Sequence, residues 1–198
     1  MSIPKGVLYL VATPIGNLGD ITFRAINILN DVSLIAAEDT RHSKKLLNHY
    51  NIKTKMISYY EHNRDNRIPY LISNLSKGQN IAVITDAGTP GISDPAYKLV
   101  RQSINIGAKI ESIPGASAFL AALTSSGLPT DRFLFEGFLP PKKGRDKRLT
   151  KIKDIDATII YYESAIRLKR TLKQLYVFFG DRPAVVAREL TKMYEQIK

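Results

Sequence analysis

Residues 81–95 read IAVITDAGTPGISDP, an apolar run followed by a loop with two glycines and a helix start. Asp94 is placed to cap that helix, with Pro95 at its first position. In open α/β sheets, ligands bind at the carboxyl ends of strands, and glycine lets the backbone approach a ligand closely. The segment predicts a strand, a candidate binding loop over Asp86–Ile92 and a helix. An ordinary strand-to-helix turn is the alternative, since the loop matches neither a Walker loop nor a complete G-x-G-x-x-G.

The same alternation of short apolar runs and helix-period segments extends through the first half of the chain. It predicts a mostly parallel sheet with crossover helices. Helices are expected from Phe23 to Asn30, capped by Asp20 or Thr22, and from Tyr97 to Ile104. The expected strands are Val7–Ala12, Val32–Ala36, Lys55–Ser58, Ile81–Thr85 and Lys109–Ile113.

The pattern changes after residue 115 to a small-residue helix, a strand at Phe133–Phe138 and a basic segment, followed by strand, helix and strand. We therefore expect two α/β domains, 1–113 and 114–198. The helix from Ile166 to Phe179 is expected to bury one apolar stripe. The last expected strand, Ala184–Arg188, is followed by a helix-like tail that ends without a cap. We therefore expect the second domain to be truncated at its end. The stripe consists of Leu168, Leu172, Leu175 and Phe179.

The composition favours a globular protein that meets polyanions. The 198 residues are 44% apolar and carry a formal net charge of +11, and a positive field of that size attracts nucleic acid or anionic membrane. No apolar run reaches the roughly 20 residues that cross a bilayer, and Val7–Ala12 is shorter than a signal-peptide core. We therefore expect a cytoplasmic protein. With no cysteine and three scattered histidines, we expect no metal site.

Two more loops follow predicted strands, and the carboxyl-end rule places them at the same edge of the sheet as the first loop. One covers residues 12–20. The other places Glu38, Asp39 and Arg41 within four residues. Together the loops predict a cleft with two carboxylates and a guanidinium. The alternative is that Asp39 or Thr40 caps the next helix and that Arg41 is a solvated charge.

Residues 142–153 hold seven basic side chains against one acid. This density is typical of a phosphate-binding segment, and a solvated loop is the alternative. Residues 114–198 carry 16 basic and 9 acidic side chains, against 13 and 9 in residues 1–113, so the polyanion is expected on the second half. The expected polyanion contacts in the segment are Lys142, Lys143, Arg145, Lys147 and Arg148.

Six motifs, taken together, resemble those of the ribosomal RNA small subunit methyltransferase I family, a branch of the tetrapyrrole methylase superfamily. The resemblance covers nearly the whole chain, and six motifs in family order make it specific. The motifs are VATPIGNLGD (11–20), AEDTR (37–41), DAGTPGISDP (86–95), IPGASA (113–118), FEGFLP (135–140) and ARELTK (187–192).

The resemblance implies a two-domain α/β enzyme that binds S-adenosylmethionine in a cleft between its domains and works as a homodimer. Its substrate would be a cytidine ribose in the decoding region of 16S rRNA, in the small ribosomal subunit. Carried over by motif, the cofactor contacts would be Asp86, Ala87, Gly88, Thr89, Pro90, Gly91, Ile92, Ser117, Ala118, Tyr162, Glu163, Arg188, Glu189 and Leu190.

Two segments depart from the family's pattern. The family's usual Glu-Ser-Pro-His-Arg is here Glu163-Ser164-Ala165-Ile166-Arg167, which removes a candidate histidine and any essential role for it. The family also more often has His where Tyr60 stands and Glu where Arg64 stands.

Methyl transfer from a sulfonium to an oxygen is a direct displacement, so we expect alignment of donor and acceptor to dominate catalysis. The acceptor hydroxyl must lose its proton, and the candidate bases are Glu38, Asp39 and Glu163. Arg41 and Asn17 are candidate anchors for RNA phosphate or ribose. The alternatives are a methyltransferase for a tetrapyrrole or other small molecule, which would not need the basic segment, and a non-catalytic RNA-binding assembly factor.

Overall fold

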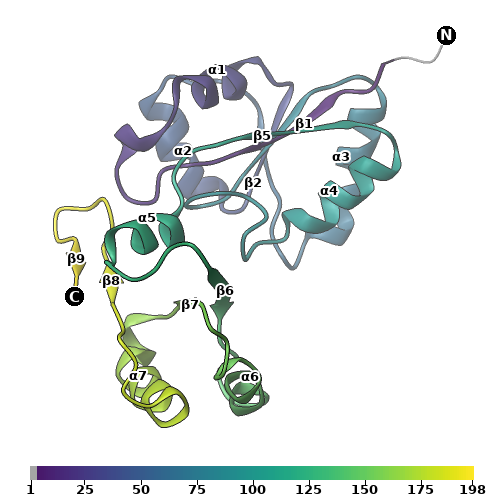
Figure 1. Ribbon diagram of the computed structural model, residues 1–198. Coiled ribbons are helices and arrows are strands. Elements are labelled where there is room, and N and C mark those ends of the chain that lie inside the picture. Colours follow the sequence, from purple (N-terminus) through teal and green to yellow (C-terminus); the bar gives the residue numbers. More distant parts are fainter. Residues whose placement is uncertain (1–3) are drawn as a thin grey trace. The chain divides into compact units, whose positions relative to one another are not determined.

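The computed structural model describes residues 4–198 and divides the chain into two compact units, both α/β (Figure 1). The first unit ends at Ser117, and the second runs from Ala118 to Lys198. The boundary expected at 113/114 falls just before the turn of Pro114 and Gly115, which belongs to the first unit. Among the described residues, no helix is both long enough and apolar enough to span a membrane.

A parallel sheet of five strands forms the centre of the first unit. Its strands are β1 (Val7–Val11), β2 (Leu34–Ala37), β3 (Met56–Ser58), β4 (Ile81–Ile84) and β5 (Lys109–Ile113). Their order is β3-β2-β4-β1-β5, so Leu8 in β1 pairs with both Ile81 and Ile110. The strands β2 and β4 are buried along their whole length, as expected for apolar runs in a parallel sheet covered on both faces.

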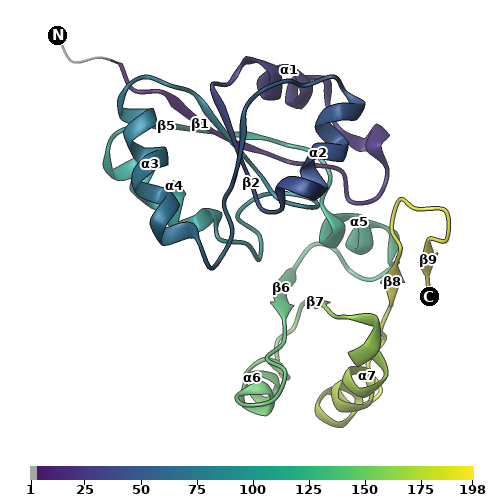
Figure 2. The same cartoon turned by 180° about the vertical axis from the view of Figure 1, so that it is seen from behind.

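Two helices cover each face of this sheet (Figure 2). On one face lie α1 (Phe23–Asp31) and α2 (Thr40–His49), and on the other lie α3 (Arg64–Ser76) and α4 (Ala96–Asn105). The expected parallel sheet with crossover helices is thus confirmed.

The helix and strand ends in this unit follow local hydrogen bonds. Thr22 rather than Asp20 caps α1, because the Thr22 hydroxyl oxygen accepts a hydrogen bond from Ala25 N–H at 3.1 Å. Asp20 instead ends a short 3-10 helix, η1 (Leu18–Asp20). The strand β2 starts later than expected, since Val32 N–H still bonds to a carbonyl of α1.

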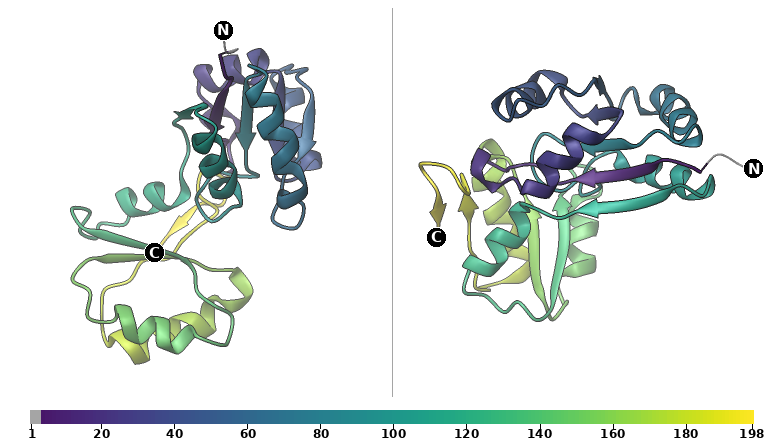
Figure 3. Two further views of the ribbon diagram at one scale, coloured as in Figure 1. Left: turned by 90° about the vertical axis from the view of Figure 1, so that its right-hand side faces the viewer. Right: turned by 90° about the horizontal axis from the view of Figure 1, so that it is seen from above.

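The second unit is built around two parallel strands, β6 (Phe133–Phe138) and β7 (Thr158–Tyr162) (Figure 3). Its remaining elements are α5 (Ala118–Ser125), α6 (Arg145–Ile152), α7 (Ala165–Phe179), β8 (Ala187–Arg188) and β9 (Gln196–Ile197). The helices α6 and α7 pack together through Leu149 and Phe178. The helix α5 contacts β6 through Phe119, whose ring centroid lies 4.8 Å from that of Phe135. The strands β8 and β9 form a separate antiparallel pair.

The side of α7 that faces the core differs from the expected stripe. Leu172 is 39% exposed, so its expected place in the core is wrong. Thr171 is buried instead, because its hydroxyl group bonds to two charged side chains of the same unit, and Phe178 joins Leu175 against the core. A polar residue therefore lies on the buried side of the helix, which a stripe of leucines does not reveal.

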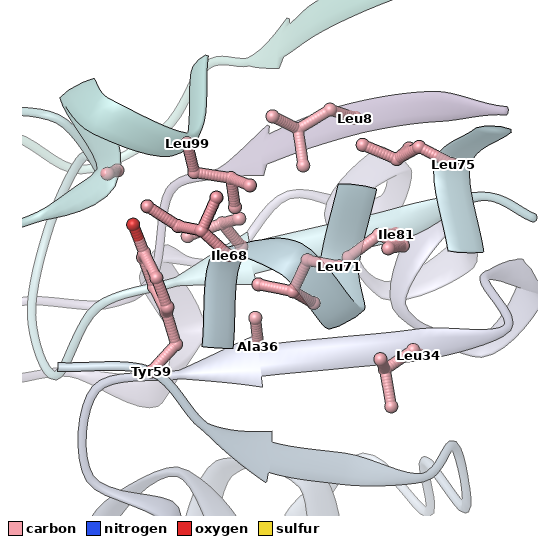
Figure 4. Packing of buried hydrophobic residues seen from close by; sticks show 11 residues of the cluster. Leu8, Leu34, Ala36, Tyr59, Ile68, Leu71, Leu75, Ile81 and Leu99 are labelled. Carbon is pink, nitrogen blue, oxygen red and sulfur yellow. The ribbon is translucent and has the colours of Figure 1, made fainter. Parts of the chain in front are cut away.

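The first unit contains two apolar cores and the second unit contains one. Figure 4 shows the core between the sheet and α3 and α4, where Leu8 packs against Leu71 and Leu99. A second core lies under α1 and α2, around Leu29. The third, in the second unit, is smaller and contains Leu149. Because full burial of a leucine stabilises by about 1.5–3 kcal/mol, the first unit gains more from apolar burial than the second.

Candidate functional site

Four loops meet at the carboxyl edge of the first unit's sheet, because all five strands run parallel. Two backbone hydrogen bonds join the loops after β1 and β4: Thr13 N–H donates to Gly88 O (2.9 Å), and Gly88 N–H donates to Thr13 O (3.0 Å). The Thr13 hydroxyl also donates to Thr85 O at 3.0 Å. The loop after β1 is therefore fixed against the candidate binding loop.

The loop after β5 is held at the same edge. The Thr89 hydroxyl donates to Ala116 O at 3.3 Å. Gly115 lies so close to β1 that a Cβ placed on it would come within 3.0 Å of Ala12 Cβ. Ser117, one of the expected cofactor contacts, directly follows this turn. Glycine at 115 thus permits the close approach of two neighbouring loops.

The candidate loop between β4 and α4 has a conformation that requires its glycines. Gly88 and Gly91 have φ of +86° and +92°, in the left-handed region that side chains rarely adopt. Asp94 fixes the end of the loop, since its carboxylate accepts hydrogen bonds from Gly91 N–H (2.7 Å) and Ala96 N–H (2.8 Å). Burial raises the pKa of Asp94, although these two hydrogen bonds oppose the rise. Between its fixed ends, the loop exposes Ala87, Gly91 and Ile92.

Glu38 connects the ends of β2 and β4. Its Oε2 accepts hydrogen bonds from the Thr85 hydroxyl (2.5 Å) and from Asp86 N–H (3.3 Å). In the reverse direction, Asp39 N–H donates to Asp86 Oδ1 at 3.1 Å. Burial and the nearby Glu38 carboxylate raise the pKa of Asp86, although the hydrogen bond from Asp39 N–H opposes them. The first unit therefore brings Glu38 and Asp86 together beside the candidate loop.

Asp39 has a different role from Glu38. It caps α2 by accepting a hydrogen bond from Arg41 N–H (2.8 Å), and the Arg41 guanidinium binds both of its oxygens at 2.9 and 3.2 Å. The hydrogen bonds from Arg41 lower the pKa of Asp39 to about 2. A carboxylate held in this way accepts a proton poorly at neutral pH. The helix-cap alternative for Asp39 is confirmed.

The other expected residues of this unit are exposed or structural. Asn17 caps η1, because its side-chain oxygen accepts a hydrogen bond from Gly19 N–H at 3.0 Å. The Arg41 side chain is 90% exposed, so it remains accessible even though it pairs with Asp39. Both side chains can therefore reach a ligand in solvent.

In the second unit, Glu163 follows β7 and its carboxylate is held by neighbours. It accepts hydrogen bonds from the Thr171 hydroxyl (2.7 Å) and Ser164 N–H (2.8 Å), and it pairs with Arg167 at 2.7 Å. Burial raises the pKa of Glu163, but these hydrogen bonds together with Arg167 and Arg145 outweigh burial, and the net pKa is lowered. Its side chain stabilises the start of α7, which makes it a poor proton acceptor.

The remaining expected cofactor contacts of the second unit lie at its strand ends. Tyr162 ends β7 and packs its ring against Phe135 (5.1 Å between centroids) and Phe138 (5.4 Å), and burial raises its pKa. Ala118 begins α5. The segment Arg188–Leu190 includes the end of β8 and a residue at positive φ, Glu189 (+52°), which pairs with a nearby lysine.

The basic segment is divided by the structure into buried and exposed cations. Arg145 is only 4% exposed, and it donates to Gln174 (2.6 Å), Thr171 (2.7 Å) and Pro140 O (3.2 Å). The expectation that Arg145 binds RNA is therefore corrected: its guanidinium is used inside the fold. Arg148 binds Glu136 through two nitrogens at 2.5 and 2.9 Å, yet its side chain is 46% exposed. The other three expected contacts, Lys142, Lys143 and Lys147, are exposed, as are Lys151 and Lys153 of the same segment.

The sequence does not predict the structural roles of several side chains. Thr13 and Thr85 lie in or next to motifs, but their hydroxyl groups bond across 72 and 47 residues of chain. The carboxylate of Glu136 is 1% exposed and bound to Arg148, and Gln174 bonds to Arg145 from another helix. Only the folded chain brings these partners together, so local spacing carries no signal for them.

Comparison with known proteins places these features in a family. The family model described as "Tetrapyrrole (Corrin/Porphyrin) Methylases" matches residues 7–198. The chain is 53% identical to the ribosomal RNA small subunit methyltransferase I of Halalkalibacterium halodurans over 97% of its own length and 67% of that protein. It is 55% identical to the protein of the same name from Synechocystis, over 96% and 69% of the two lengths. The chain thus spans about two thirds of these relatives.

Solved structures show the same fold at much lower identity. A diphthine synthase has a TM-score of 0.76 at 14% identity, covering 98% of this chain and 81% of that one. A uroporphyrin-III-C-methyltransferase from Thermus thermophilus has a TM-score of 0.67 at 16% identity, with 98% and 84% covered. These similarities support the α/β fold and carry no argument about the reaction.

Proposed function

Since the chain belongs to the tetrapyrrole methylase family, and within it to the ribosomal RNA small subunit methyltransferase I group, we propose that it methylates small-subunit ribosomal RNA. The proposed donor is S-adenosylmethionine, and the proposed acceptor is the ribose 2′-hydroxyl of a cytidine in the decoding region. The observation that carries this proposal is the identity of about half the residues over nearly the whole chain.

The residues present fit S-adenosylmethionine. In the β4–α4 loop Ala87 and Ile92 are exposed, and Gly91 has open space where a side chain would lie. The Asp86 carboxylate lies at the start of this loop, and carboxylates accept hydrogen bonds from ammonium and ribose hydroxyl groups. The proposed contacts are Asp86–Ile92 and Ser117 in the first unit, and Ala118, Tyr162, Glu163 and Arg188–Leu190 in the second.

S-adenosylmethionine, when bound, supplies an electrophilic methyl group on a sulfonium. The chain's own residues would bind the donor and align its methyl group with the acceptor hydroxyl, because direct displacement depends on the geometry of approach. The hydrogen bonds between Thr13 and Gly88 keep the β4–α4 loop in one conformation, which reduces the ordering cost of binding.

Among the three candidate bases, Glu38 is the one we retain. Asp39 is bound by Arg41, and Glu163 is bound by Thr171 and Arg167. These partners stabilise the charged carboxylates and lower their pKa values, which makes both poor proton acceptors. Glu38 accepts only neutral donors, from Thr85 and Asp86. Its role would be to take the proton of the acceptor hydroxyl.

The proposed partner is 16S rRNA in the small subunit. The proposed contacts are Asn17, Arg41 and the exposed lysines Lys142, Lys143 and Lys147, and a cytoplasmic location follows from that substrate.

We also propose a homodimer, since two-fold pairs are the commonest oligomers. Sedimentation should give twice the monomer mass at micromolar concentration, and a stable monomer would contradict this part.

A methylation assay tests the proposed function. Small ribosomal subunits from a strain without the methyltransferase would be incubated with the purified chain and labelled S-adenosylmethionine, and the rRNA digested to nucleosides for mass spectrometry. We expect 2′-O-methylcytidine, and none with Glu38→Gln despite retained cofactor binding. Label transferred to a tetrapyrrole instead would favour a small-molecule methyltransferase. Absence of S-adenosylmethionine binding would favour an assembly factor.

A further inference from the structure

The helices α6 and α7 pack against each other in the second unit. They pack through the core around Leu149, and side-chain hydrogen bonds link them directly. Gln174 of α7 donates to Asp146 (2.5 Å) and accepts from Arg145 (2.6 Å). This contact sets the start of α6 beside the middle of α7, and the two helices lie side by side in the ribbon view (Figure 3).

Both helices carry exposed basic side chains. On α7, Lys169 and Arg170 precede Lys173 by four and three residues, so all three lie on the same side of the helix, and all are exposed. On α6, the exposed Lys147 and Lys151 are again four residues apart. Within residues 4–198, none of these five cations lies within ion-pair distance of an acid.

Three acids that contact these helices are bound to partners other than these five cations. Glu136 is bound to Arg148, with its carboxylate 1% exposed. Glu163 is 7% exposed at its side chain and is bound to Arg167. Asp146 accepts the hydrogen bond from Gln174. We name the remaining five cations the α6–α7 basic surface: Lys147, Lys151, Lys169, Arg170 and Lys173.

We propose that the α6–α7 basic surface is a docking surface for the phosphate backbone of RNA, with Lys169, Arg170 and Lys173 of α7 as contacts beyond the basic segment. Unpaired cations bind phosphates and release condensed counterions, which gives affinity without sequence readout. Tyr176 is 64% exposed, three residues after Lys173, and offers a ring on which an unpaired base can stack. The choice of RNA rests on the proposed function.

The test compares two charge-matched triple variants. Lys169→Gln/Arg170→Gln/Lys173→Gln removes the α7 cations. Lys53→Gln/Lys55→Gln/Lys77→Gln removes three exposed lysines near the amino ends of β3 and β4, at the opposite edge of the sheet from the cofactor loop. Affinity for a 16S rRNA transcript and for small subunits would be measured against salt, with circular dichroism to verify folding and calorimetry for S-adenosylmethionine.

We expect the α7 variant to lose about two units from the slope of log affinity against log salt, at roughly 0.7–0.9 per lost contact. Its affinity for S-adenosylmethionine should stay unchanged, and the control variant should keep the wild-type slope. Equal slopes in the two variants would overturn the proposal. So would a loss of binding to phosphatidylserine vesicles with RNA affinity intact, since the surface would then serve a membrane.

The outcomes also separate this proposal from the one on which it rests. A wild-type chain that methylates small subunits, combined with an α7 variant of normal salt dependence, would overturn the docking surface alone. A wild-type chain that binds the transcript through α7 but methylates no RNA would contradict the proposed function and leave the docking surface supported. A wild-type chain that binds no RNA would overturn both.

Discussion

Adjacent residues at the end of β2 show how local partners decide the use of a carboxylate. Glu38 reaches across to β4 and bonds to neutral donors, whereas Asp39 turns back onto α2 and binds a guanidinium. The two side chains are equivalent in the sequence as candidate bases. Their partners, and not their position, separate the carboxylate that we propose as the base from the one that caps a helix.

The lowered pKa of Asp39 gives stability a specific pH dependence. The pKa is about 2 in the folded chain and 3.8 by its ordinary value, so the ionised form favours folding. The contribution is present above about pH 4 and is lost as the pH falls toward 2. Asp39→Asn should therefore be less stable than the wild type at pH 6, with the difference shrinking below pH 4. Urea unfolding across this range checks it, and a difference constant with pH would contradict the interpretation.

Gly88→Val should reduce S-adenosylmethionine affinity at least tenfold. A side chain at φ +86° is strained, and its Cβ would lie 3.4 Å from Ile15 Cγ2. Gly107→Val is a matched control, because Gly107 has φ +75° with nothing within 4 Å and lies at the other edge of the sheet. Both variants should lose about 1–3 kcal/mol of stability, but calorimetry should show weaker cofactor binding only for Gly88→Val. Equal affinities in both would remove the loop from the site.

At the scale of elements, two strands are predictable to the residue, whereas one helix of the first unit is not predictable from its sequence pattern. Lys109–Ile113 and Phe133–Phe138 have the bounds that their sequence predicts. The helix α3 has no counterpart in the prediction, since Pro69 and a polar first turn hide its buried leucines. The four loops of the site follow from parallel strands. The burial of Arg145 could not be predicted, because it depends on Thr171 and Gln174, which only the packing of α7 on α6 supplies.

That packing makes Arg145 a structural residue of α6. Arg145→Met should lose about 3–5 kcal/mol of unfolding free energy, since it removes a buried guanidinium that bonds to Gln174 and Thr171 and pairs with Glu163. Lys147→Met, two positions later on the exposed side of the same helix, should change stability by less than about 0.5 kcal/mol. Denaturant unfolding of both variants measures the contrast. Similar small losses would mean that Arg145 is free to serve as a phosphate contact after all.

At the scale of the whole molecule, the two units have separate apolar cores, and each should respond to its own substitutions. Leu99→Ala in the first unit and Leu149→Ala in the second each empty a fully buried site and should cost about 2–5 kcal/mol. Hydrogen exchange should show lost protection confined to the unit that carries the substitution. Loss of protection in both units from either substitution would indicate that they unfold as one cooperative body.

The position of β1 inside the sheet also affects how the chain folds during synthesis. Leu8 pairs with Ile81 and Ile110, so β1 has no strand partner until β4 has been made. At ribosomal rates of about 5–20 residues per second, that wait is on the order of ten seconds. Over that time the backbone groups of β1 stay unpaired, and closing so long a loop is slow. Chaperones that bind emerging chains should therefore associate with this segment early and release it once β4 has emerged.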